Sequence, residues 1–409
     1  MKRLVKIIVS VILISVALVA LVHKTSPDVS YDLDLLNRFC QSKESNKVNY
    51  LFEHTESDRH LKSNVWDGVP VKGAIYMFVR NEQLQDARAT MRSIEDRFNS
   101  QQVNGSYPWI FLNHQRFTPE FIKYIRKVAN DPDQVYFGRV DLEAWHYPAW
   151  IDSHRAENAV KRMVALGIQN SYSLYHRQRM RYQTGLFFHH SLFDTVEYVW
   201  RVEAGTVYAC DMLSSVHDPF VAMKLGNRKL GFTVTMKENP GSVFSLWPAS
   251  LQYIRENANM IVPIEDGIMP WLMNRKHEYN FCYIWPDQEL VSIAYLRSEE
   301  YKAYFHYLDL VGGFFYERWT DGSAKTIAAA MFLKKKEIKF FNNIGFTDAA
   351  ATHCPFGSKL MDRCTCDYQE NYNFKRNSCT INLLRYIDPP AIENMVSFAK
   401  QKLIQEEKN

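Results

Sequence analysis

The stretch from Trp200 to Asp211 contains the residues of this chain that are best suited to chemistry. Its sequence is Trp-Arg-Val-Glu-Ala-Gly-Thr-Val-Tyr-Ala-Cys-Asp, with an apolar start, Glu203 near the middle and Gly205 soon after. This order predicts a buried strand that breaks at a glycine turn and leaves a carboxylate at its tip. The carboxyl ends of strands in an open α/β sheet commonly bind ligands, and a carboxylate there suits a metal ion beside a nucleotide diphosphate.

Two Asp-x-Asp motifs are the other candidates for a divalent cation. Asp32-Leu33-Asp34 lies in a polar segment near the N-terminus, and Asp131-Pro132-Asp133 lies in a proline turn before a strand. Aspartate in such a turn usually caps and turns the chain. Glu203 is therefore the better metal candidate, with an ion pair to Arg201 as the alternative role.

Short apolar segments that alternate with amphipathic segments must position these residues. The predicted strands are 74–79, 109–112, 135–137, 198–202 and 230–235, and the predicted helices include 83–98 and 119–128. Short buried strands alternating with helices predict an α/β fold whose mostly parallel sheet is covered by helices on both faces. No glycine-, serine- or proline-rich linker divides residues 72–380, so we expect a single catalytic-size domain.

The N-terminus predicts attachment to a membrane. Residues 1–6 are basic and residues 7–22 are apolar, and with Leu4 and Val5 the run approaches the ~20 residues that cross a bilayer. The basic flank stays in the cytosol, which places the rest of the chain in the lumen. A cleaved signal peptide is the alternative, with Ser15-Val16-Ala17 as a possible cleavage site. We expect a cytosolic tail over 1–6, a signal anchor over 7–22, a stem over 23–65 and a lumenal domain over 66–409.

The cysteines and the net charge narrow the class of protein. Four of the seven cysteines crowd the C-terminal end, without a C-x-x-C pair. Disulfides are therefore favoured over a zinc site, and the odd number leaves at least one thiol free or in an intermolecular bond. The net charge is only +4, with basic and acidic residues interspersed, which argues against a nucleic-acid partner.

Five blocks of sequence follow one another in the order of a known family. They are Arg80-Asn81 with Met91–Asn99, Tyr107–Asn113, Tyr147–Asp152, Tyr279–Leu290 and Gly312–Trp319. Over about residues 70–385 the chain resembles the fungal Golgi α-1,2-mannosyltransferase family, glycosyltransferase family 15. The resemblance implies a GT-A type, Rossmann-like fold in the Golgi membrane, with Mn²⁺ as cofactor. It also implies retaining transfer of mannose from GDP-mannose to mannose residues of O- or N-linked glycoprotein glycans.

The resemblance assigns the catalytic role to Glu289, within Trp285–Leu290. The family places a carboxylate there near the anomeric carbon, on the face opposite the leaving diphosphate. Such a group either forms a covalent mannosyl intermediate or stabilises an oxocarbenium-like one. Asp287 stands where the family often has asparagine, and its charge is expected to raise one of the two pKa values.

The resemblance also suggests two metal ligands. Glu203 aligns with the family's metal-binding carboxylate, although Ala204-Gly205-Thr206 replaces the usual Pro-x-Val. Asp348 falls at the second histidine of a Gly-Tyr-His-His block. A carboxylate is a good ligand for a hard cation such as Mn²⁺, and a plain turn residue is the alternative role for Asp348.

The remaining site residues are assigned to the nucleotide sugar. His176 replaces a tyrosine that is expected to contact the nucleotide in the family. The diphosphate is expected to bind to Arg80, Arg177 and Arg181. Asp321 is expected to bind a sugar hydroxyl. Ordinary surface charge is the alternative for the arginines. The chain departs from the family at His176, Ala204-Gly205 and Asp348. The alternative is therefore a catalytically weakened family member that binds glycans or organises a Golgi complex.

Overall fold

The computed structural model describes residues 60–102, 105–212 and 218–406. The expected cytosolic tail and signal anchor, nearly all of the stem, and the motif Asp32-Leu33-Asp34 lie outside this part of the chain. Among the residues described, no helix is both long enough and apolar enough to span a bilayer.

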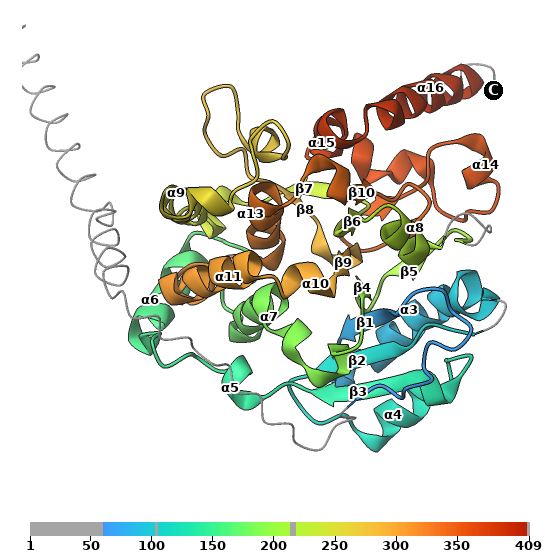
Figure 1. Ribbon diagram of the computed structural model, residues 1–409, viewed down its shortest axis with the longest axis horizontal. Helices are drawn as coiled ribbons and strands as arrows, with labels where there is room; N and C mark the ends of the chain where they lie inside the picture. Colours follow the sequence, from blue (N-terminus) through green and yellow to red (C-terminus); the bar gives the residue numbers. More distant parts are fainter. Residues whose placement is uncertain (1–59, 103–104, 213–217, 407–409) are drawn as a thin grey trace, which may run out of the picture. The chain divides into compact units, whose positions relative to one another are not determined.

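A seven-stranded sheet forms the centre of the described chain, in the order β10-β6-β9-β4-β1-β2-β3 (Figure 1). Its strands are β1 (Gly73–Phe78), β2 (Trp109–Asn113), β3 (Val135–Arg139), β4 (Tyr198–Arg201), β6 (Leu230–Phe232), β9 (Leu290–Ser292) and β10 (Ile338–Phe340). All neighbouring pairs are parallel except those of β9, which is antiparallel to both β4 and β6. The expected mostly parallel α/β sheet is confirmed.

Helices cover both faces of this sheet. The α-helices are α3 (Leu84–Arg97), α4 (Pro119–Arg126), α5 (Leu142–Trp145), α6 (Ser153–Ala165), α7 (Leu174–Gly185), α8 (Pro219–Leu225), α9 (Leu246–Glu256), α10 (Ile293–Leu296), α11 (Glu299–Val311), α12 (Gly313–Tyr316), α13 (Asp321–Phe332), α14 (Ser358–Met361), α15 (Thr380–Ile387) and α16 (Pro389–Glu406). Figure 1 shows α3, α4 and α8 on one side of the sheet and α7 and α11 on the other.

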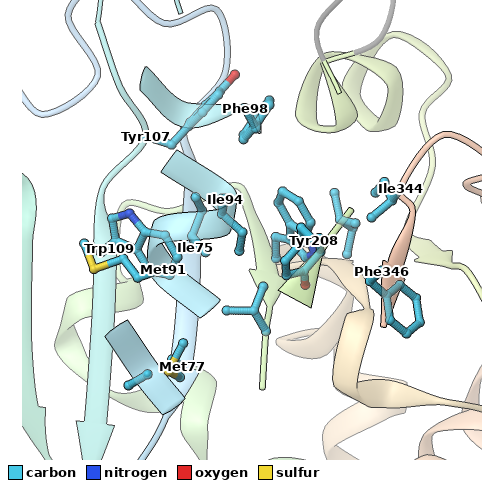
Figure 2. Packing of buried hydrophobic residues seen from close by; sticks show 14 of the residues in the cluster. Ile75, Met77, Met91, Ile94, Phe98, Tyr107, Trp109, Tyr208, Ile344 and Phe346 are labelled. Atoms are coloured by element: carbon cyan, nitrogen blue, oxygen red, sulfur yellow. The ribbon is translucent and has the colours of Figure 1, made fainter. Parts of the chain in front are cut away.

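The alternation of side chains along β1 explains why this strand is apolar throughout. Ile75 and Met77 point to one face and pack with Met91 and Ile94 of α3 (Figure 2). On the opposite face, Tyr76 stacks on Phe187 with a ring-centroid distance of 5.1 Å. A strand buried on both faces has no polar positions to alternate with, so the continuous apolar run correctly predicted a central strand.

The predicted strand over 230–235 is wrong as a single element. Its first half is β6, Thr233 and Val234 belong to no strand, and Thr235 begins β7 (Thr235–Lys237), which pairs antiparallel with β8 (Cys282–Ile284) in a separate two-stranded sheet. Between them, the carbonyl of Thr233 accepts a hydrogen bond from the Asn373 side chain (3.1 Å). A distant side chain satisfies this backbone group where a strand neighbour would otherwise do so.

Three disulfides are present among the described residues, of which two join the C-terminal region to earlier segments and one lies within that region. They are Cys210–Cys364, Cys282–Cys379 and Cys354–Cys366. The preference for disulfides over zinc is thus confirmed for these cysteines, and Cys40 lies outside the described residues. The first bridge connects the segment after β5 (Val207–Tyr208) to the segment after α14, which are 154 residues apart in sequence.

The close contact between α7 and α11 yields a test of the fold. Gly185 lies so near α11 that an added β-carbon would stand 2.1 Å from Cγ of Phe305. We predict that Gly185→Ala lowers the free energy of unfolding by about 1–3 kcal/mol, because a packed interior resists added volume. Guanidinium chloride unfolding followed by tryptophan fluorescence measures the loss.

The double variant Gly185→Ala/Phe305→Leu is the control, since the smaller side chain leaves room for the new methyl group. Its loss should be smaller than the sum of the two single losses. Simple additivity would contradict the contact.

Candidate active site

Glu203 lies just beyond the end of β4, in a tight turn. The amide of Thr206 donates to the carbonyl of Glu203 (3.2 Å), and Gly205 has a φ of +100°, a conformation that favours glycine. From α3, the hydroxyl of Thr90 contacts both the Glu203 carbonyl (3.3 Å) and the Gly205 amide (3.0 Å). A glycine turn held by a threonine thus stands where the resemblance leads us to expect proline.

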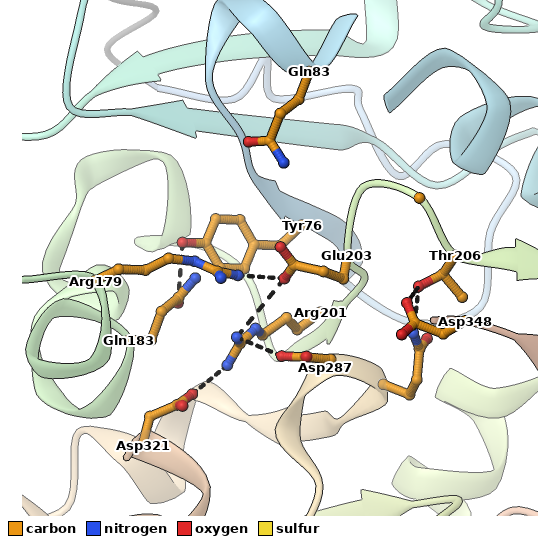
Figure 3. A network of polar contacts seen from close by, with 12 residues as sticks. Tyr76, Gln83, Arg179, Gln183, Arg201, Glu203, Thr206, Asp287, Asp321 and Asp348 are labelled. Atoms are coloured by element: carbon orange, nitrogen blue, oxygen red, sulfur yellow. Dashed lines mark hydrogen bonds and ion pairs between the residues drawn. The ribbon is translucent and has the colours of Figure 1, made fainter. Parts of the chain in front are cut away.

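Arg201, at the end of β4, gathers several carboxylates around one buried guanidinium. Its side chain is 1% exposed and contacts Asp321, Asp287 at 2.8 Å and Glu203 at 3.9 Å (Figure 3). Burial alone would raise the pKa of Asp321, but Arg201 and Lys325 hold it below its usual value. The ion pair between Arg201 and Glu203, the alternative role that the sequence allowed for Glu203, is therefore present as one member of a larger cluster.

A second guanidinium, that of Arg179 on α7, contacts the same Glu203 oxygen. Burial raises the pKa of Glu203, Arg179 and Arg201 oppose this shift, and the charge of Asp287 adds to it. The pKa of Asp287 is raised as well, with burial as the largest cause, followed among the raising charges by Asp321 and Asp348. From the sequence, the charge of Asp287 is expected to raise one of the pKa values of Asp287 and Glu289. Both pKa values are raised, but burial is the main cause.

Glu289 lies between the 3-10 turn Pro286–Gln288 and β9 and is 1% exposed. Its carboxylate contacts the ammonium of Lys325, and its carbonyl accepts from the amide of Arg201 (2.9 Å). Burial raises the pKa of the Glu289 carboxyl, while Lys325 and Arg201 lower it. Because Asp321 and Lys325 are one turn apart on α13, one helix face holds both Arg201 and Glu289.

Asp348 reaches the site through a small antiparallel sheet. Strand β11 (Phe346–Thr347) pairs with β5 and with β12 (Thr352–His353), and Thr347 stands opposite Val207. This register brings Asp348 to Thr206, whose hydroxyl donates to the Asp348 carboxylate (2.8 Å). The other Asp348 oxygen accepts from the amide of Ala350 (2.9 Å), which is a turn contact. Asp348 thus combines a turn role with a position beside the Glu203 turn.

The chemistry of two side chains suits a divalent cation. Glu203 and Asp348 carry carboxylate oxygens, the ligand type that Mn²⁺ favours, and Thr206, three residues after Glu203, hydrogen-bonds to Asp348. Asp287 is close enough that its charge raises the pKa of Glu203, while the charge of Asp348 raises that of Asp287. This accumulation of negative charge is what a bound cation would relieve.

Two arginines assigned to the nucleotide lie in internal contacts. Arg181 binds both carboxylate oxygens of Asp309 at 2.6 and 2.8 Å, and Arg177 donates to the carbonyls of Ser171 and Glu317. Each arginine is 1% exposed. The assignment of Arg177 and Arg181 to a diphosphate stays a prediction, and this geometry gives it no support.

The other nucleotide candidates lie nearer the carboxylate cluster. The guanidinium of Arg80 lies 4.8 Å above the ring of Tyr175, just after β1. His176 accepts from Arg318 at 3.2 Å, and burial together with Arg318 lowers the pKa of His176 to about 3, so its ring is neutral. Asp321, assigned to a sugar hydroxyl, is engaged by Arg201. These three assignments also stay predictions.

Sequence reasoning missed Arg179 and Lys325 and treated Arg201 only as an alternative partner. Lys325 had a usable signal, because it follows Asp321 by four residues, which is one turn if the segment is helical. Arg179 had a weaker one, since it shares a helix face with Gln183, which contacts the hydroxyl of Tyr76 (3.2 Å). Nothing in the composition of α7 marks that face.

Comparison with known proteins gives consistent matches over most of the chain. The family model described as glycolipid 2-alpha-mannosyltransferase matches residues 34–388. Glycolipid 2-alpha-mannosyltransferase 2 of Candida albicans is 34% identical over 312 residues, covering 76% of this chain and 66% of that protein. O-glycoside alpha-1,2-mannosyltransferase omh1 of Schizosaccharomyces pombe is 33% identical over 325 residues, covering 79% and 81%.

Two solved structures resemble this fold closely. Core-mannan synthase A of Aspergillus fumigatus, in its Mn/GDP form, has a TM-score of 0.72 and 28% identity, covering 78% of this chain and 86% of that one. The mannosyltransferase Ktr4p of Saccharomyces cerevisiae, in complex with GDP, has a TM-score of 0.73 and 26% identity, covering 88% and 93%.

The Arg201 cluster yields a prediction on stability and pH. We predict that Arg201→Met lowers the free energy of unfolding by about 3–5 kcal/mol near neutral pH, because buried carboxylates lose their counter-charge. Since Arg201 depresses the pKa of Asp321, the part of its benefit that comes from Asp321 is full above about pH 4 and is lost as the pH falls further. Urea unfolding at pH 7 and at pH 3 measures both effects.

Arg201→Lys is the matched control, since it keeps one positive charge and should lose less stability at pH 7. An equal loss for Arg201→Met at both pH values would contradict the role of charge.

Proposed function

The chain belongs to the glycolipid 2-alpha-mannosyltransferase family, glycosyltransferase family 15, and on this premise we propose that it transfers mannose from GDP-mannose to a glycan. The acceptor is a mannose 2-hydroxyl on an O- or N-linked glycoprotein glycan, and the new α-1,2 linkage retains the anomeric configuration. The observation that carries the proposal is Glu289, buried against Lys325 beside a cluster of arginines and carboxylates at the end of β4.

Guanidinium groups at this edge suit the diphosphate of the donor. Arg80, Arg179 and Arg201 each have a buried Nε without a hydrogen-bond partner in the described part of the chain. Buried donors of this kind are normally satisfied, and phosphate oxygens accept from guanidinium groups in short, charge-assisted bonds. We infer that these three groups face the leaving nucleotide.

Manganese is the proposed cofactor, as in the Mn/GDP form of core-mannan synthase A. In this chain Glu203 and Asp348 would hold the ion, and Thr206 orients the Asp348 carboxylate. When bound, the ion supplies positive charge to the leaving diphosphate. Thr90 contributes indirectly, because it fixes the turn that carries Glu203.

Glu289 performs the step that determines retention. As an ionised carboxylate it forms a covalent mannosyl intermediate or stabilises an oxocarbenium-like one. Burial opposes ionisation by raising its pKa, and Lys325 and Arg201 counteract that rise. Because this carboxylate and its cationic partners are intact, we favour the enzyme over a weakened glycan-binding or complex-organising subunit.

For the location we propose a single-pass type II protein of the Golgi membrane with its catalytic domain in the lumen. The support is the basic segment 1–6 followed by the apolar segment 7–22. Three disulfides in the described chain fit an oxidising compartment.

The activity is tested on Glu289. The full chain in detergent, given GDP-mannose, α-methyl mannoside and Mn²⁺, should form an α-1,2-linked disaccharide, identified by NMR. We predict that Glu289→Gln lowers transfer by about 1,000-fold or more, since the amide is neither nucleophile nor charge, yet leaves GDP affinity within about threefold.

Glu120→Gln, on the exposed side of α4, is the control for a lost carboxylate. If wild type forms no disaccharide with any metal while folded, the proposed activity fails. If Glu289→Gln keeps normal transfer, only the assignment of Glu289 fails.

The metal role of Asp348 is tested by separating its charge from its turn contact. We predict that Asp348→Ala raises the Mn²⁺ concentration for half-maximal transfer by about tenfold or more, because the ion loses an anionic ligand. Asp348→Asn keeps an oxygen for the Ala350 amide but loses the charge. If Asn restores the wild-type Mn²⁺ dependence, Asp348 is a turn residue only.

A further inference from the structure

Arg179 lies where a cation bound to Glu203 would also lie. Its Nη2 contacts Oε2 of Glu203, and Nη2 of Arg201 is 3.9 Å from the same oxygen. The side chains of Arg179 and Glu203 are only 16% and 15% exposed, so solvent screens their interaction weakly. One carboxylate oxygen of the metal candidate therefore already faces resident positive charge (Figure 3).

Arg201 is not an equivalent partner for Glu203. Its guanidinium contacts Asp321 and lies 2.8 Å from Asp287, so most of its charge is matched by these two carboxylates. Arg179, in contrast, has Glu203 as its only carboxylate within ion-pair distance among the described residues. The charge of Arg179 is thus the one that balances Glu203.

The orientation of α7 about its axis directs Arg179 toward the site and directs Arg177 and Arg181 away from it. Arg179 and Gln183 are four residues apart and face Glu203 and Tyr76, whereas Arg177 and Arg181 face the opposite side. The charges of Arg179, Glu203 and Arg80 all act on the Tyr175 ring. Arg179 thus contacts Glu203, Arg80 lies over the Tyr175 ring, and the buried Nε of Arg179 lacks a hydrogen-bond partner in the described chain.

We propose that Arg179 is a resident counter-ion of Glu203 that binds the diphosphate of the donor and reduces the need for a divalent cation in nucleotide binding. This inference rests on the proposed use of GDP-mannose. The guanidinium competes with Mn²⁺ for a Glu203 oxygen, since two cations on one oxygen repel each other. It also offers the diphosphate an N–H donor that needs no metal.

The test is GDP binding by the full chain in detergent, measured by calorimetry in EDTA and in Mn²⁺. Wild type should bind GDP in EDTA within about threefold of its affinity in Mn²⁺. Arg179→Met should lose about tenfold or more in EDTA and recover in Mn²⁺, because it lacks the resident charge. Arg179→Lys should retain part of the binding in EDTA.

A second measurement addresses the competition directly and uses Mn²⁺ as the only probe. Electron paramagnetic resonance of free Mn²⁺ should show tighter ion binding to Arg179→Met than to wild type, by about threefold or more. Arg92→Met, on the exposed side of α3 where Arg92 pairs with Asp96, should match wild type in both measurements. If Arg179→Met does not fold, Arg179→Gln replaces it, since its amide can still donate to Glu203.

The inference is overturned if wild-type GDP binding requires Mn²⁺ absolutely, or if the neutral Arg179 variant has the wild-type ratio of affinities in EDTA and Mn²⁺. A failure of the proposed function has a different result, in which folded wild type binds no GDP even with Mn²⁺.

Discussion

The buried guanidinium of Arg201 is the interaction on which the rest of the site depends. It lies at the end of β4, in the middle of the sheet, and is almost fully excluded from solvent. Three carboxylates from separate parts of the chain surround it. Glu203 lies in the turn after β4, Asp287 in the turn before β9 and Asp321 at the start of α13. A buried charge is tolerated only with partners, so Arg201 fixes where these segments meet.

Lys325 extends the same principle to Glu289. The Glu289–Lys325 pair connects the turn before β9 to α13 directly, and Arg201 connects the same two segments a second time by contacting both Asp287 and Asp321. The turn before β9 and the helix α13 are therefore fixed relative to each other and to β4. A carboxylate that is proposed to act at the anomeric carbon needs such rigid support.

The fold was largely readable from the sequence, but the direction of single side chains was not. Apolar runs such as 74–79 identified the central strands because burial on both faces leaves no polar positions. The run 230–235 failed because Asn373, distant in sequence, satisfies the backbone where the strand breaks. On α7, side chains on nearly every side are buried, so the sequence shows no apolar stripe from which to predict which side faces the site. The resemblance to the family selects Arg177 and Arg181 by their positions, while the fold directs Arg179 toward Glu203.

The disulfide between Cys210 and Cys364 has a consequence for the maturation of the enzyme. Cys210 lies two residues beyond β5, the strand that holds β11 and hence Asp348 beside the Glu203 turn. This outer sheet is therefore secured by a covalent bond in addition to its noncovalent packing. Before the bond forms, the reduced chain lacks this constraint, so the position of Asp348 beside the Glu203 turn is less firmly fixed than in the oxidised chain.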